Sequence, residues 1–172
     1  MIGINFSKYF IRLEIGAMDD LLIARAVHVI GVVAWFGGVW FVTFVVLPAI
    51  RRAEPPERRI SAFQRIEGRF APQAGFWVLL TGASGFWLVV RMDLWWRFAD
   101  PAYWWMWAML LVWAVFVLIL FVLEPLVIHP LLRGGDPEGR WHRRLQIVHV
   151  VLSLAGFVAI AGAVAGSHGW AP

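Results

Sequence analysis

Residues 71–90, APQAGFWVLLTGASGFWLVV, contain no charged side chain, and three other long apolar runs flank this segment. A helix needs roughly 20 mostly apolar residues to cross the hydrocarbon core of a bilayer. The four predicted spans are residues 21–50, 71–90, 102–124 and 145–167, and each is too long for a strand. The sequence therefore predicts an all-α fold, an integral membrane four-helix bundle with short loops.

The composition points to the same environment. Of the 172 residues, 61% are hydrophobic and only 15% are charged, whereas a soluble domain carries about a quarter charged residues. The chain has no Cys, which excludes disulfides, thiolate zinc sites and iron–sulfur clusters. The net charge is +4, but the basic residues lie between apolar runs, where they indicate topology and not nucleic-acid binding.

The distribution of Lys and Arg predicts the orientation. The loops at residues 51–70 and 126–144 hold ten of the fifteen Lys and Arg residues. Cytoplasmic loops carry an excess of these residues. We therefore expect both loops in the cytoplasm, both termini outside, and a location in a bacterial inner membrane.

Two segments next to the spans are predicted to lie on the membrane surface. Residues 1–18 lack an apolar core of signal-peptide length, so we expect an amphipathic surface helix there or a natural start at Met18. Residues 19–172 then form a single domain. In the first Arg-rich loop, Ile60, Phe63 and Ile66 recur at helical spacing, which predicts a second surface helix over residues 60–70.

Two histidines lie inside predicted spans, where an ionisable side chain is costly and is by default a functional candidate. By a rise of 1.5 Å per residue, His28 lies about 10 Å from the outer end of its span. His149 lies about 10 Å from the cytoplasmic end of the fourth span. We therefore expect the two imidazoles to serve separate sites and not to bind one metal ion.

Glycines share the helix faces of both histidines. Gly31 and Gly38 follow His28 on one face, and Gly156 follows His149 after seven residues. Glycine allows a flat ligand or a neighbouring helix to approach the backbone closely. With an axial imidazole this pattern suits haem b, and it equally suits plain helix packing with each histidine hydrogen-bonded across the bundle.

A soft ligand set is predicted in the outer half of the membrane. The thioethers of Met106 and Met109 lie near the depth of His28, and Met92 and His168 lie closer to the surface. Thioether and imidazole ligands together suit copper(I). The alternative is that the methionines only fill gaps in an apolar core.

Two further polar residues follow the third span. Glu124 lies at its cytoplasmic end, and His129 lies just beyond. Ionisable groups at this depth can relay protons. The alternative for Glu124 is an interfacial carboxylate paired with an arginine of the loop.

Aromatic residues crowd the outer connection between the second and third spans. These are Trp95, Trp96, Phe98, Tyr103, Trp104, Trp105 and Trp107. Amphipathic rings gather at headgroup depth, so we interpret this segment as an aromatic belt. The alternative is stacking on a quinone or a porphyrin.

The stretch RAVHVIGVVAWFGGVWFVTFVVLPAI, residues 25–50, resembles the first helix of the copper-resistance protein D (CopD) domain and of the related HemJ-type membrane proteins. Residues 65–90, RIEGRFAPQAGFWVLLTGASGFWLVV, are similar to their second helix. LEPLVIHPLLR, residues 123–133, is similar to the helix end before their last loop. The resemblance covers residues 20–167 and implies a small stand-alone version of this membrane domain.

The resemblance implies a role for His28, which matches the first-helix histidine of these proteins. CopD-type proteins are associated with copper uptake or resistance, and HemJ-type proteins bind haem b and oxidise protoporphyrinogen. The chain lacks the Lys near the start of the third span and the later Tyr-His pair that HemJ-type proteins carry. This departure weighs against protoporphyrinogen oxidation.

Three functions follow as hypotheses. The first is a CopD-like membrane protein that handles copper in transport or resistance. The second is a haem b-binding redox protein that exchanges electrons with a quinone or a membrane partner protein. The third is a metal-free structural or assembly subunit, and the sequence does not decide between copper and haem b as the cofactor.

Overall fold

The computed structural model describes residues 6–128, 130 and 140–170, with the backbone alone described for residues 6–18. These residues are helical almost throughout and contain no strand, which confirms the predicted all-α fold. Four helical segments are long and apolar enough to cross a membrane: Asp19–Ala53, Pro56–Arg91, Pro101–Ile128 and Arg140–Ser167. The chain is an integral membrane protein, and lipid covers its apolar surface.

The first crossing is a continuous helical rod of three elements. Helix α1 (Phe6–Phe41) passes into a π-helical segment, η1 (Val42–Val46), and then into α2 (Leu47–Ala53). Residues 6–18 are the first turns of α1, so they do not form a surface helix separate from the first span. The crossing therefore extends beyond the predicted span at both ends.

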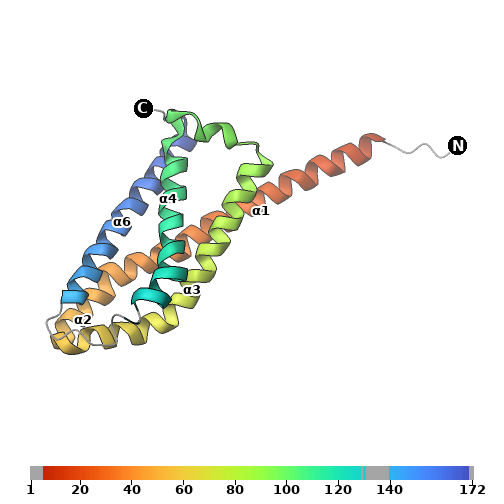
Figure 1. Ribbon diagram of the computed structural model, residues 1–172. Helices are drawn as coiled ribbons and strands as arrows, with labels where there is room; N and C mark the ends of the chain where they lie inside the picture. The colour runs from red at the N-terminus through yellow and green to blue at the C-terminus, as the bar shows by residue number, and fades with distance from the viewer. Residues whose placement is uncertain (1–5, 129, 131–139, 171–172) are drawn as a thin grey trace.

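Helix α3 (Pro56–Arg91) contains both the predicted surface segment and the second span. Residues 60–70 are helical, as predicted, but they are continuous with the second span and do not form a helix of their own. Proline has no N–H to donate to the carbonyl of Gly68, and its ring crowds that turn, so Pro72 bends the helix instead of stopping it. In Figure 1 the first part of α3, in yellow, runs along the Arg-rich end of the bundle before the helix rises.

The second half of the chain forms the other two crossings. Two short 3₁₀ turns, η2 (Trp95–Phe98) and η3 (Pro101–Tyr103), lead into α4 (Trp104–Leu118) and the π-helical η4 (Ile119–Ile128). The Asp100 carboxylate accepts a 2.9 Å hydrogen bond from the N–H of Ala102 and caps this start. The last crossing is α6 (Arg140–Ser167).

The crossings pack as two helix pairs that meet at mid-depth. Helix α1 packs mainly on α3, and α4 packs mainly on α6. The pairs are joined by a buried apolar cluster of Trp35, Val39, Val78 and Phe116, in which the Trp35 and Phe116 rings meet edge to face at 4.9 Å. In Figure 1 the red first part of α1 diverges from the start of α4 and the end of α6.

Glycines of one helix receive aromatic rings of another throughout the bundle. The pairs are Gly38 with Phe70, Gly156 with Phe36, Gly82 with Trp113, Gly162 with Trp104, and Gly166 with Trp105. Trp105 is consequently buried between α4 and α6. It therefore faces α6 and not lipid, whereas Trp95, Trp96 and Trp107 are exposed at the end of the bundle that holds η2 and η3.

Candidate functional site

His28 lies on α1 and faces α3, in the half of the bundle away from the Arg-rich loops. Its Nδ1 atom is 2.9 Å from the backbone carbonyl oxygen of Thr81. A carbonyl only accepts, so Nδ1 must carry the proton, and the neutral ring then has its lone pair on Nε2. The ring also lies against Gly85, where a Cβ atom would approach it to 3.0 Å.

The surroundings of His28 hold further polar groups. The hydroxyl of Ser84 lies 3.4 Å from Nδ1 of His28 and donates to the carbonyl oxygen of Leu80 at 2.7 Å. Thr81 Oγ1 and Trp35 Nε1 are buried and have no hydrogen-bond partner among the residues that the structure describes. A buried polar atom without a partner costs about 1–3 kcal/mol. One of these two atoms belongs to Thr81, whose carbonyl bonds His28, and the other belongs to Trp35, two helical turns after His28 on α1.

The glycines predicted beside the two histidines are covered by protein. Gly31 faces the side chain of Thr81, since a Cβ at Gly31 would stand 2.5 Å from Thr81 Oγ1. Gly38 faces the ring of Phe70 in the same way, and Gly156 faces the ring of Phe36. These glycines allow neighbouring helices to pack closely, and the space beside each one is filled.

His149 lies in the half of the bundle nearer the Arg-rich loops, far from His28. Its Nδ1 atom is 3.0 Å from the carbonyl oxygen of Leu145, one turn earlier in α6, and its ring meets Phe63 of α3 edge to face at 6.2 Å. His28 meets the same helix at Thr81, 18 residues further along. That separation is about 27 Å of helix, so the two imidazoles do not share a metal ion.

Polar side chains link the crossings near His149. The hydroxyl of Thr43 donates to the carbonyl oxygen of Val39 at 2.6 Å and lies 3.1 Å from the hydroxyl of Ser153. The side-chain amide of Gln146 donates to the carbonyl oxygen of Thr43 at 2.8 Å. Thr43 and Ser153 are fully buried, so these bonds tie η1 to α6 inside the membrane.

Glu124 is buried in η4 and lies close enough to Glu67 of α3 for the two carboxylates to interact electrostatically. Both π-helical segments contain a group that disturbs the regular backbone bonds: Thr43 competes for a carbonyl, and Pro125 has no N–H to donate. Such segments occur frequently at functional sites. His129, the predicted relay partner of Glu124, lies outside the described residues.

The remaining predicted ligands lie on other helices. Met106 is buried and Met109 half-buried on α4, while His168 is exposed at the end of α6, its Nδ1 atom 2.8 Å from the carbonyl oxygen of Val164. Within the described ranges, no group of three or more His, Asp and Glu side chains is placed to hold a metal ion. That set does not include thioethers. Helix α1, which carries His28, packs mainly on α3, whereas α4, which carries Met106 and Met109, packs mainly on α6.

Comparison with known protein families finds one match to this chain. A model described as "Domain of unknown function (DUF4149)" matches residues 30–134. The chain belongs to the DUF4149 family. The DUF4149 match begins two residues after His28 and ends before α6, so it contains Thr81, Glu67 and Glu124 but neither site histidine. No curated protein and no solved structure matches the chain.

Sequence reasoning missed several polar residues of the interior. Thr43, Gln146, Thr81 and Ser84 carry no charge and sit in apolar runs, where they resemble ordinary helix positions. Glu67 lies in the Arg-rich segment at residues 51–70, which the sequence predicts to be a cytoplasmic loop. The signal for Glu67 was present, because it lies four residues from Phe63 and three from Phe70, on the face of α3 that packs inward.

Proposed function

We propose that this protein handles copper(I) as cargo in the outer half of the membrane, with Nε2 of His28 as the principal ligand. The single observation that carries the proposal is the 2.9 Å hydrogen bond between His28 Nδ1 and the Thr81 carbonyl oxygen. Metal-binding histidines typically donate one ring N–H to a carbonyl or carboxylate, which fixes the tautomer and leaves the other nitrogen for the metal.

Soft ligands support copper(I) over harder cations. Met106 and Met109 supply thioethers on α4, and copper(I) prefers thioether and imidazole ligands. The resemblance of residues 25–50 to the first CopD-type helix supports the same cargo. His168 is the candidate for a first contact at the outer surface, since it is exposed at the end of α6.

The inner half offers a second polar region for a cation that crosses. Glu67 and Glu124 bring two carboxylates together there, and the apolar cluster around Trp35 and Phe116 separates them from His28. In this proposal the apolar cluster is the barrier that the cargo must pass, and Glu124 is the inner acceptor or a proton relay. The Arg-rich loops face the cytoplasm, as the positive-inside distribution predicts.

Haem b fits the described geometry poorly. A porphyrin between helices needs space beside small residues, but Thr81, Phe70 and Phe36 cover Gly31, Gly38 and Gly156. A porphyrin at one of these glycines would have to displace the side chain that covers it.

A metal-free structural or assembly subunit is the second candidate. One observation favours it: Nδ1 of His28 and of His149 each already bonds a backbone carbonyl, so both rings have a structural role as they stand. In that case the hydrogen bond of His28 fixes α1 against α3. The protein would then stabilise or help to assemble a complex with a membrane partner protein.

The first experiment is copper(I) binding by the purified protein in mild detergent, titrated against a chromophoric copper(I) chelator under reducing conditions. We expect one copper ion per chain, an affinity at least tenfold lower for His28→Ala and lower for Met106→Leu. Met18→Leu is the matched control, because Met18 precedes the predicted first span and is not among the expected ligands.

The outcomes separate the three hypotheses. Unchanged copper binding in His28→Ala, or no binding by the wild-type protein, would overturn the copper proposal. A Soret band in the spectrum of the protein as purified, lost in His28→Ala, would establish haem b instead. Neither copper nor haem, with a loss of stability in His28→Ala, would leave the structural subunit.

A further inference from the structure

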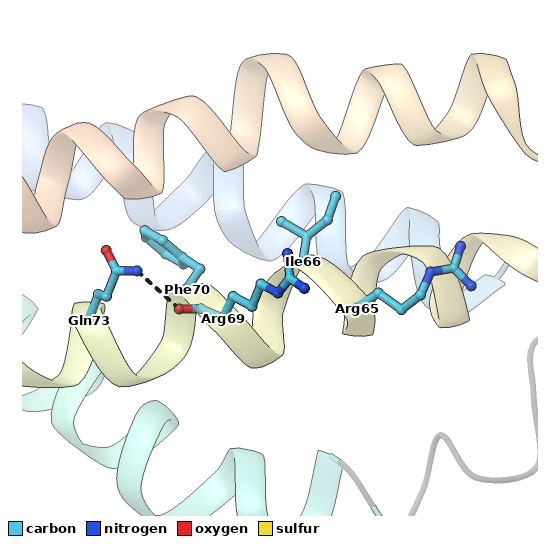
Figure 2. A pocket seen from close by; sticks show the side chains of 5 residues that line it. All are labelled: Arg65, Ile66, Arg69, Phe70 and Gln73. Carbon is cyan, nitrogen blue, oxygen red and sulfur yellow. Dashed lines mark hydrogen bonds between the residues drawn. The ribbon is translucent and has the colours of Figure 1, made fainter.

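A groove lies on an exposed side of α3, at the Arg-rich end of the bundle. It has a volume of about 300 Å³ and is lined by Arg65, Ile66, Arg69, Phe70 and Gln73. Figure 2 shows Ile66 and Phe70 directed toward α1, with the two arginines extending along α3 beside them. The groove is separate from the His28 region, which lies at the opposite end of α3.

The five lining side chains occupy one face of the helix. Arg65, Arg69 and Gln73 follow at intervals of four residues, and Ile66 and Phe70 form the adjacent row. Phe70 closes the floor of the groove, because its ring packs against Gly38 of α1. The groove thus has a polar edge of two guanidinium groups and one amide, and an apolar floor.

This edge of the groove carries two positive charges, from Arg65 and Arg69. Among the residues that the structure describes, neither Arg65 nor Arg69 makes an ion pair with a carboxylate. Glu67 lies two positions beyond Arg65 and is therefore turned about 200° away around the helix. Two guanidinium groups one turn apart can hold a single phosphate through several charge-assisted hydrogen bonds.

We propose that this groove binds the headgroup of one anionic phospholipid. The phosphate meets Arg65 and Arg69, the headgroup meets the Gln73 amide, and the start of an acyl chain lies on Ile66 and Phe70. The mixture of cationic edge and apolar floor matches a lipid better than a soluble phosphate, which has no apolar part. The expected cytoplasmic orientation also places the groove in the anionic leaflet.

This inference is independent of the copper proposal, because the groove shares no residue with the His28 site. The test uses native mass spectrometry of the full-length protein with added phosphatidylglycerol, and with phosphatidylcholine of the same acyl chains. We expect one phosphatidylglycerol per chain to persist and phosphatidylcholine to dissociate. In the double variant R65Q/R69Q the fraction of chains holding phosphatidylglycerol should fall at least fivefold.

The matched control is R51Q/R52Q, which removes the same charge from exposed positions at the end of α2. It should retain the lipid as the wild-type protein does. The site would be overturned if the two double variants lost phosphatidylglycerol equally or retained it equally. It would also be overturned if the wild-type protein held phosphatidylcholine as well as phosphatidylglycerol. Displacement of the lipid by millimolar glycerol phosphate would show that the groove recognises phosphate alone, which would overturn the lipid assignment. Arg65 and Arg69 are exposed, so both double variants should fold.

Discussion

The hydroxyl groups of Thr43 and Ser153 lie 3.1 Å apart and join η1 to α6 inside the membrane. Because the Thr43 hydroxyl donates to the carbonyl oxygen of Val39, the Ser153 hydroxyl is the donor between the two side chains. Gln146 donates to the Thr43 carbonyl from the same helix. Thr43 is thus bonded through both its side chain and its backbone to α6.

The first prediction concerns the strength of this link. Ser153→Ala should lower the free energy of unfolding by about 1 kcal/mol, and Thr43→Val should lower it further because the bond to Val39 is lost as well. The coupling between the two substitutions should be about 0.6 kcal/mol, the average for interhelical hydrogen bonds in a membrane protein. A double-mutant cycle measured by reversible unfolding in mixed micelles checks this value, and additive effects would show that the bond contributes nothing.

The second prediction compares two adjacent glycines. A Cβ at Gly38 would stand 2.5 Å from the ring of Phe70, whereas a Cβ at Gly37 meets nothing within 4 Å. Gly38→Ala should therefore destabilise the protein by about 1–3 kcal/mol, the usual cost of overpacking. Gly37→Ala should be neutral or stabilising by up to about 1 kcal/mol, because alanine is the better helix former.

Thermal unfolding of both variants in the same detergent tests this difference. The double variant Gly38→Ala with Phe70→Leu is the control, since a smaller side chain opposite residue 38 should recover part of the lost stability. Equal melting temperatures for the two single variants would contradict the close contact between α1 and α3.

The third prediction concerns the ion pair between Asp20 of α1 and Arg91 of α3. The guanidinium and the carboxylate approach to 3.1 Å, but the side chains are 39% and 36% exposed, with Arg91 the more exposed. Exposed pairs contribute about 0–1 kcal/mol. Asp20→Asn should therefore shift the melting temperature only slightly, and the shift should shrink further in high salt. A large, salt-independent loss of stability would show that the pair is shielded.

The fourth prediction concerns orientation. The chain has no Cys, so a single introduced thiol can be labelled without background. With a membrane-impermeant maleimide on intact cells, Ser167→Cys at the outer end of α6 should react, whereas Ser61→Cys in the first part of α3 should react only after permeabilisation. Both positions are exposed. The reverse pattern would place the Arg-rich loops outside.

The long apolar runs were sufficient to predict the four crossings, because only helices satisfy their own backbone groups within lipid. The separation of His28 and His149 also followed from the sequence, since it depends only on the rise per residue. The structure agrees, with Thr81 beside one ring and Phe63 beside the other.

Helix faces were harder to predict than helix positions. A π-helical turn contains an extra residue, which shifts the face presented by later residues by about 100°. Segments η1 and η4 introduce such shifts, so a regular 3.6-residue repeat does not locate the side chains beyond Val42 or Ile119. The side chains that pack on the glycines could not be predicted either, because they belong to helices far away in the sequence.

The aromatic–glycine pairs have a consequence for how the bundle finds its register. Lipid is as apolar as a leucine side chain, so burial alone does not fix how far one helix slides along another. Sliding by one turn, about 5.4 Å, would move Phe36 away from Gly156 and Trp113 away from Gly82. Each ring would then meet a side chain in place of a bare backbone, so a bundle with few polar contacts still has one well-defined axial alignment.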